Sequence, residues 1–138
     1  MITPAQLIDQ AREWRGVKFL HQGSTRLGCD CLGFIAGTLA ELGCPIGLEQ
    51  MPHGYGRNPQ AQLLEQLSPV ARKIPLTAGA LILIQWPHAE YPSHAAIYTG
   101  TSMIHALESA GYVVEHGYRE PWLRMTRSIW TVPGVTYE

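Results

Sequence analysis

Two cysteines and an aspartate lie together in the stretch RLGCDCLGFIAG (Arg26–Gly37), at the start of a segment with helical periodicity. Asp30 stands where a helix N-cap belongs, which places Cys31 in the first turn. The free N–H groups and the dipole of that turn favour an anion, so the Cys31 thiol should lose its proton more readily than a thiol in solution. The same N–H groups could hold an oxyanion during acyl transfer. Cys29 and Cys44 have no such setting, and Cys31 is the predicted nucleophile.

A nucleophilic cysteine needs a base, and only His94, His105 and His116 of the six histidines lie in segments predicted as strands. If Thr99 and Gly100 form a two-residue hairpin loop, His94 lies directly opposite His105 on the next strand. A four-residue loop keeps both on one face but diagonal, and a three-residue loop disrupts this pairing. We expect His94 to act as base and His105 to fix its tautomer. Spacing alone leaves open a small buried cysteine and a merely packed histidine pair.

Two helices and a run of strands must position these side chains. A capping box at Thr3 predicts a helix from Pro4 to about Trp14, and a second helix should run from Cys31 to a stop at Gly43. A short helix is expected from Asn58 to about Leu67. Segments rich in β-branched and aromatic residues predict strands within 80–86, 93–100, 102–108, 111–117 and 127–135. The pattern predicts one α+β domain over 1–138, with an antiparallel sheet of about five to six strands covered by N-terminal helices.

Composition excludes several function classes. The 138 residues carry a net charge of -1, with scattered arginines and lysines, so the sequence predicts neither a nucleic-acid footprint nor an anionic-lipid surface. No apolar run approaches the ~20 residues of a membrane helix, and the start lacks the pattern of an export signal. Three cysteines favour reduced thiols over a disulfide scaffold. A zinc site from the three cysteines and a histidine is the weaker alternative, because C-x-C is a poor chelating pair.

Three short motifs in register resemble the NlpC/P60 peptidases, which are papain-like cysteine hydrolases of bacterial cell-wall peptides. These motifs are DCLGFI (Asp30–Ile35), SHAAIYTG (Ser93–Gly100) and MIHA (Met103–Ala106), and TAGALILIQW resembles the strand that leads to the family's histidine. The resemblance implies Cys31 as nucleophile, His94 as general base and His105 as the third, orienting residue. It also implies cleavage of the peptidoglycan stem peptide between D-glutamate and the following diamino acid, without a cofactor.

Within the family, the phage-tail and gene-transfer-agent type is the most similar, through His21-Gln22-Gly23 and the approach Gly28-Cys29-Asp30-Cys31. The resemblance therefore implies phage tail proteins as partners. Together with the missing export signal, it implies a protein made in the cytoplasm and carried on a virion to the periplasm or cell wall.

Two positions depart from the family pattern. Phe19 stands where many members have a tyrosine whose hydroxyl helps the oxyanion site, which leaves His21, Gln22 or the Cys31 backbone N–H as donors. Leu32 replaces a serine after the cysteine. Asp30 and Ser93 complete the expected substrate and oxyanion residues. Two other readings stay open: a structural tail component that has lost catalysis, for which Phe19 argues, and an acyl transferase or amidase acting on another amide or ester.

Overall fold

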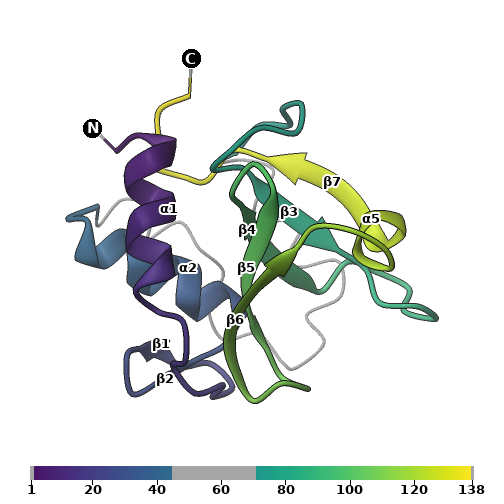
Figure 1. The fold of residues 1–138 in the computed structure, drawn as a ribbon, viewed down its shortest axis with the longest axis horizontal. Helices are drawn as coiled ribbons and strands as arrows, with labels where there is room; N and C mark the ends of the chain where they lie inside the picture. The colour runs from purple at the N-terminus through teal and green to yellow at the C-terminus, as the bar shows by residue number, and fades with distance from the viewer. Residues whose placement is uncertain (1, 45–70, 138) are drawn as a thin grey trace.

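The computed structural model describes residues 2–44 and 71–137, so the predicted helix from Asn58 to Leu67 lies outside the described residues. The elements in chain order are α1 (Pro4–Arg12), β1 (Ser24–Thr25), β2 (Gly28–Cys29), α2 (Cys31–Glu41), β3 (Leu81–Ile84), β4 (His94–Tyr98), β5 (Ser102–Leu107), β6 (Tyr112–Gly117), α5 (Trp122–Met125) and β7 (Thr126–Trp130) (Figure 1). Helices come first and strands follow, which confirms the α+β class. No helix in the described ranges is long and apolar enough to cross a membrane.

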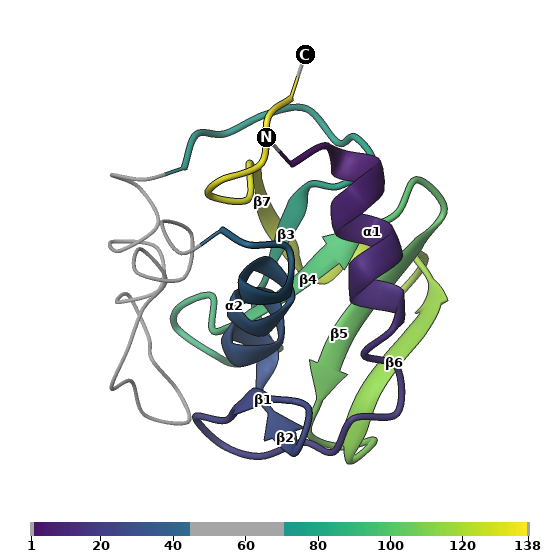
Figure 2. The ribbon, with the colours of Figure 1, turned by 90° about the vertical axis from the view of Figure 1, so that its left-hand side faces the viewer.

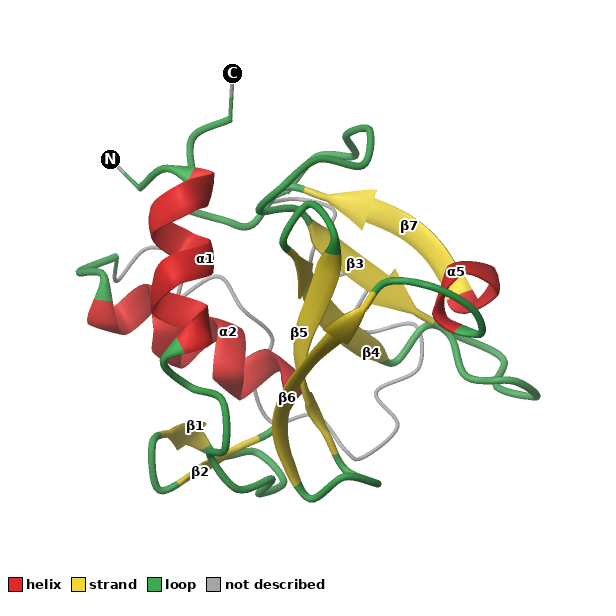
Figure 3. Cartoon of the chain, in the orientation of Figure 1, coloured by secondary structure: helices red, strands yellow, loops and turns green. Residues whose placement is uncertain are grey.

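The main sheet has five antiparallel strands in the order β6-β5-β4-β3-β7. Helices α1 and α2 lie against one face, as Figures 2 and 3 show. Because side chains alternate along a strand, the three central strands β3, β4 and β5 each contribute to two cores. Leu81, Leu83, Ala95, Ile97 and Ile104 pack with α1 and α2, whereas Ile82, Ile84, Ala96 and Met103 pack with Trp86, Trp122 and Met125 on the far face.

Helix α1 begins as the sequence predicts. The Thr3 hydroxyl accepts from the Gln6 N–H and the Gln6 side chain accepts from the Thr3 N–H, which completes the capping box. The helix ends at Arg12, two residues before the predicted end. Trp14 is still buried in the turn that follows, and its indole N–H donates to Glu41 of α2 at 2.9 Å. The two helices are therefore joined by a hydrogen bond at the end of α1.

Helix α2 is the centre of the larger core, with nine of its eleven residues buried. Two glycines permit this close packing. A Cβ at Gly33 would overlap the backbone carbonyl oxygen of Gly23, and a Cβ at Gly37 would overlap the Trp14 ring. The loop before the helix also forms a small antiparallel pair, β1 with β2, which lies outside the segments predicted as strands. The start of α2 is thus fixed against backbone as well as side chains.

The hairpin between β4 and β5 corrects one prediction. Tyr98 pairs with Met103, so the loop has four residues and His94 is not directly opposite His105. The physical reason is the Thr99 hydroxyl, which accepts from the Ser102 N–H at 2.9 Å and stabilises the longer turn. Gly100 supplies the positive φ of 113° that this turn requires. The two histidines share one face of the sheet but lie on a diagonal, the alternative arrangement that a four-residue loop predicts.

Candidate active site

The site begins with the N-cap of α2. Asp30 is buried, and its Oδ1 accepts from the Gly33 N–H at 2.8 Å, as an N-cap side chain does. Its Oδ2 accepts from the Gln22 N–H at 2.8 Å, so one carboxylate joins the loop to the helix. Gln22 has a positive φ of 63°, which the Asp30 bond helps to hold. The predicted N-cap is confirmed, and Cys31 is the first residue of α2.

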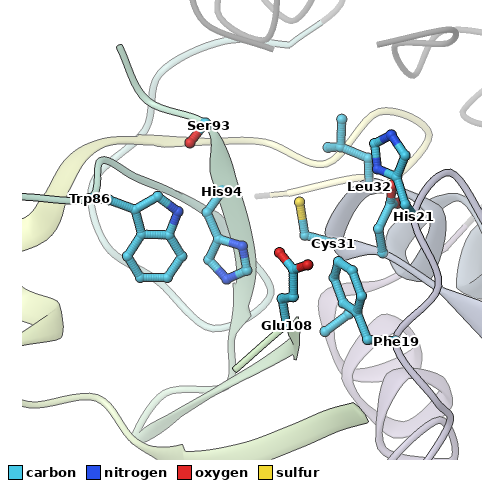
Figure 4. Close-up of a pocket in the computed structure, with 10 residues that line it drawn as sticks. Phe19, His21, Cys31, Leu32, Trp86, Ser93, His94 and Glu108 are labelled. Atoms are coloured by element: carbon cyan, nitrogen blue, oxygen red, sulfur yellow. The ribbon is translucent and has the colours of Figure 1, made fainter. Parts of the chain in front are cut away.

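A pocket opens between the start of α2 and the start of β4 (Figure 4). Its lining includes six of the predicted site residues: Phe19, His21, Asp30, Cys31, Ser93 and His94. The other lining residues are Leu32, Trp86, Ala106 and Glu108. Gln22 does not line the pocket and contributes through its backbone N–H to Asp30. The structure therefore brings the predicted thiol and the predicted base into the same cavity, with the Cys31 sulfur pointing toward the His94 side of it.

Burial dominates the acidity of the Cys31 thiol. Desolvation raises its pKa to about 12 and the neighbouring Asp30 carboxylate adds to the rise, while the backbone N–H groups of Ala95, Leu32 and Cys31 act in the opposite direction. The expectation of a more acidic thiol is wrong, because the loss of water around the sulfur outweighs the helix terminus. Burial therefore favours the protonated thiol, and a nucleophilic role for Cys31 would require a base that takes this proton.

Three histidines form a row across β4, β5 and β6. His94 Nε2 lies 2.6 Å from His105 Nδ1, His105 Nε2 lies 2.8 Å from His116 Nε2, and His116 Nδ1 lies 3.1 Å from the Gly117 carbonyl oxygen. Because His94 Nε2 is engaged by His105, Nδ1 is the nitrogen of His94 left for the pocket. The predicted contact between His94 and His105 is present, although it forms along the diagonal.

Desolvation keeps His94 and His105 uncharged. Burial lowers the pKa of His94 to about 3, and burial together with the adjacent His94 and His116 lowers that of His105 to about 2. Two indole rings contribute to the burial of these histidines. Trp86 lies 5.0 Å from His94 between ring centroids, and Trp122 lies 5.0 Å from His105. At neutral pH His94 is therefore an unprotonated imidazole that can accept a proton.

Trp86 and Trp122 form a wall rather than a platform for ligand. The two rings meet edge to face at 5.8 Å, and both belong to the smaller core. Trp130 is buried in the larger core. All three tryptophans are therefore part of the core or of the pocket wall.

Sequence reasoning missed two contributors, His116 and Glu108. The signal for His116 was present, since His94, His105 and His116 follow one another at intervals of eleven residues. Both hairpins have four-residue loops, with Tyr98 paired to Met103 and Leu107 paired to Tyr112. Because the sequence spacing and the loop lengths are equal, His116 lies diagonal to His105 just as His105 lies diagonal to His94. Glu108 stands at the start of the second loop and carries a carboxylate into the pocket near Phe19 (Figure 4).

The oxyanion side of the pocket differs from the family pattern. The Phe19 ring lines the pocket and has no hydrogen-bond donor, while His21 lines it and carries ring nitrogens. Leu32 places an apolar side chain where the family has a serine. The backbone N–H groups of Cys31 and Leu32, in the first turn of α2, and of Ala95 are the donors beside the sulfur. The three cysteines are free thiols, and within 2–44 and 71–137 no three His, Cys, Asp or Glu side chains gather in a way that could hold a metal ion.

A cysteine at a helix N terminus, beside a histidine on an antiparallel sheet, is the arrangement of the papain-like α+β class. The chain belongs to the NlpC/P60 family, whose sequence model matches residues 16–131. This confirms the resemblance carried by the three motifs.

Relatives and solved structures agree with this membership. The chain is 28% identical over 119 residues to the murein DD-endopeptidase MepS/murein LD-carboxypeptidase of Escherichia coli K12, covering 86% of this chain and 56% of the relative. It is 31% identical over 111 residues to the probable endopeptidase NlpC of the same organism, covering 78% of this chain and 64% of the relative. The NlpC/p60 domain of the peptidoglycan hydrolase SagA has the same fold, with a TM-score of 0.64 and 20% identity over 93% of this chain and 97% of that domain. The chain thus spans a little over half the length of the first relative.

Proposed function

We propose that the chain is a cysteine peptidase that hydrolyses the stem peptides of peptidoglycan. One observation carries the proposal: the Cys31 thiol and the His94 imidazole line one pocket, with His94 Nε2 bonded to His105 and Nδ1 left for the thiol. Family membership and relatives named as murein endopeptidases support the substrate class. Cys31 is the nucleophile in this proposal, His94 the general base and His105 the residue that orients it.

The states of these groups suggest a defined sequence of proton transfers. Cys31 starts as a thiol and His94 as a neutral imidazole. As the substrate amide enters, the proton moves from sulfur to His94 Nδ1 and the sulfur attacks the carbonyl carbon. The resulting imidazolium returns the proton to the leaving amine, and a thioester remains. Water, deprotonated by His94, then hydrolyses the thioester and restores the thiol.

In this proposal the oxyanion is held mainly by the helix terminus. The Cys31 backbone N–H belongs to the first turn of α2, where N–H groups lack intrahelical partners. Phe19 cannot add a donor, and His21, which lines the same pocket, takes its place. Loss of one oxyanion donor costs about 10²- to 10³-fold in rate, so His21 is the residue to test as the replacement.

The finer assignments extend the same proposal. The family resemblance supports cleavage between D-glutamate and the following diamino acid. The approach from His21-Gln22-Gly23 to Cys31 resembles the phage-tail type, which supports phage tail proteins as partners and a virion that carries the protein to the periplasm or wall. Glu108 and Asp30 place carboxylates at the pocket, where a positively charged group of a diamino acid would be complementary.

The test is digestion of purified stem-peptide muropeptides with product masses read by mass spectrometry. The native chain is compared with Cys31→Ala, and Cys29→Ala serves as the matched control because Cys29 is buried outside the pocket. We expect new D-glutamyl ends from the native chain and from Cys29→Ala, and none from Cys31→Ala. Cleavage that persists in Cys31→Ala would refute the nucleophile. An inactive native chain would favour the structural tail component, and turnover of esters alone would favour an acyl hydrolase with another substrate.

A further inference from the structure

The row of histidines ends on a group that can only accept a hydrogen bond. His116 Nδ1 lies 3.1 Å from the Gly117 carbonyl oxygen. A carbonyl has no hydrogen to give, so His116 must carry its proton on Nδ1 to make this bond. In a neutral imidazole the other nitrogen is then an acceptor. His116 Nε2 therefore presents a lone pair to His105.

The same argument assigns the protons of His105 and His94. His105 Nε2, 2.8 Å from His116 Nε2, must be the donor, which leaves His105 Nδ1 as an acceptor. His94 Nε2, 2.6 Å from His105 Nδ1, must then be the donor. His94 is left with a lone pair on Nδ1, the nitrogen that remains for the pocket and Cys31. Every hydrogen bond in the row points from the pocket toward Gly117.

The opposite direction would disable the base. If each proton shifted to the other nitrogen of its ring, His94 would carry a hydrogen on Nδ1 and could not accept one from Cys31. In that arrangement the lone pair of His116 Nδ1 would face the lone pairs of the Gly117 carbonyl oxygen. Two acceptors would then face each other at 3.1 Å with no hydrogen between them, which is unfavourable at this partly buried position. The carbonyl therefore selects the arrangement in which His94 is a base.

We propose that His116 is a positioning residue for this site: through His105 it fixes His94 in the tautomer whose Nδ1 is free to take the proton of Cys31. The proposal rests on the proposed peptidase function only for its effect on rate. His116 does not line the pocket and reaches the reacting atoms only through two other rings.

Strand β6 is held so that His116 keeps its place. Glu115, the preceding residue, accepts from Arg12 of α1 at 3.1 Å and from the Ser102 hydroxyl of β5 at 2.7 Å. The β5–β6 register pairs His116 with Met103, and the Trp122 ring lies 5.2 Å from the His116 ring between centroids. The β6 chain is thus held by α1 and β5 at Glu115, and the His116 ring itself packs against Trp122 of α5. When His94 gains a proton, its stronger donation to His105 is passed to His116 by polarisation along the row.

Histidine-ring NMR on the native chain tests the proposal directly. A two-bond ¹⁵N–¹H correlation spectrum at neutral pH distinguishes the two tautomers of each ring, and single His→Gln variants assign the signals. We expect protons on Nε2 of His94, on Nε2 of His105 and on Nδ1 of His116. A proton on Nδ1 of His94 in the native chain would overturn the proposal whatever the enzyme's activity.

Two variants at position 116 separate the hydrogen bond from the shape of the ring. His116→Phe keeps an aromatic ring but offers no acceptor, and we expect His94 to gain an Nδ1–H population and kcat to fall roughly 10-fold with KM unchanged. His116→Gln restores an acceptor for His105 Nε2–H and should recover most of kcat and the native His94 tautomer. If His116→Phe keeps the native tautomer and kcat, or if His116→Gln is no better than His116→Phe, the proposal is wrong.

The readouts distinguish the two proposals. If the native chain cleaves no muropeptide but shows the expected tautomers, the proposed function fails and the role of His116 stands. If it cleaves muropeptides and the tautomers differ, the function stands and the role of His116 fails.

Discussion

The two faces of the five-stranded sheet bury very different side chains. The face toward α1 and α2 packs aliphatic residues such as Leu81, Leu83 and Ile97 against Phe34 and Leu39 of α2. The far face has a smaller apolar cluster and carries the row of three histidines under Trp86 and Trp122. The large core fixes the strands, and the fixed strands hold three polar rings in a row in which His94 and His105 are buried. The candidate active-site pocket forms where the two faces meet, at the start of α2 and the start of β4.

The largest effect on stability is expected on the helix face. Phe34 of α2 is fully buried and its ring meets the Trp14 ring edge to face at 6.0 Å, so Phe34→Ala should lower the free energy of unfolding by about 3–5 kcal/mol. On the far face, Met103→Leu nearly conserves volume and should cost less than about 1.5 kcal/mol. Urea denaturation measures both. Equal losses for the two variants would contradict a division of the molecule into a large and a small core.

Lowering the pH should decrease the free energy of unfolding through His94 and His105. The pKa of His94 falls from 6.5 to about 3 and that of His105 to about 2 on folding, so the unfolded chain binds protons that the folded chain refuses. Their contribution to stability is complete above pH 6.5 and is lost as the pH falls, by about 1.4 kcal/mol per pH unit for each ring. Urea denaturation at pH 7, 6 and 5 checks the slope. His105→Phe should flatten it, and a free energy of unfolding that stays constant from pH 7 to 5 would refute the prediction.

Desolvation should also make the Cys31 thiol less reactive. With its pKa raised from 9.0 to about 12, Cys31 of the free protein should react with iodoacetamide at pH 7 roughly 40-fold more slowly than an ordinary thiol. The rate should rise tenfold per pH unit above neutrality. The Cys29→Ala/Cys44→Ala double variant isolates the signal. A rate that is already constant above pH 6 would instead indicate a preformed thiolate–imidazolium pair.

The smallest effect concerns α1, away from the pocket. Thr3→Ala removes the hydroxyl of the capping box and should cost about 1 kcal/mol of unfolding free energy, whereas Thr3→Ser should keep most of it. Muropeptide cleavage should be unchanged in both variants, because Thr3 caps the end of α1 opposite to Arg12, the residue that contacts β6. A fall in cleavage rate at unchanged folded fraction would show that α1 contributes to the pocket.

Local rules predict most of the elements. The capping residues Thr3 and Asp30 mark both helix starts correctly, and the predicted segments contain four of the five strands of the sheet, while β7 begins one residue before its segment, at Thr126. These features depend on neighbours in the sequence, which is why the sequence shows them. The short helix α5 was missed because Trp122–Met125 is only four residues long and has no capping side chain. Such a segment has no periodicity to detect.

Long-range properties of the site were less accessible. The sequence indicates Cys31, His94 and His105, and the structure places the first two in one pocket and the last two in contact. The direct cross-strand pairing was wrong, since the Thr99 side chain lengthens the loop. The acidity of Cys31 was wrong in sign, because a helix start can be read from sequence whereas the loss of water around a side chain depends on the whole fold.

The two ends of the described chain meet at one side of the molecule. Ile2 forms a parallel bridge with Val135, and the Thr136 N–H donates to the Ile2 carbonyl at 2.9 Å (Figure 1). A short Gly/Ser connector could therefore close the backbone into a ring, and new ends could be opened at the exposed Gly100–Thr101 turn. Such a circular permutant would keep every strand neighbour while changing the order of synthesis. This architecture thus lends itself to insertion as a cassette within another polypeptide.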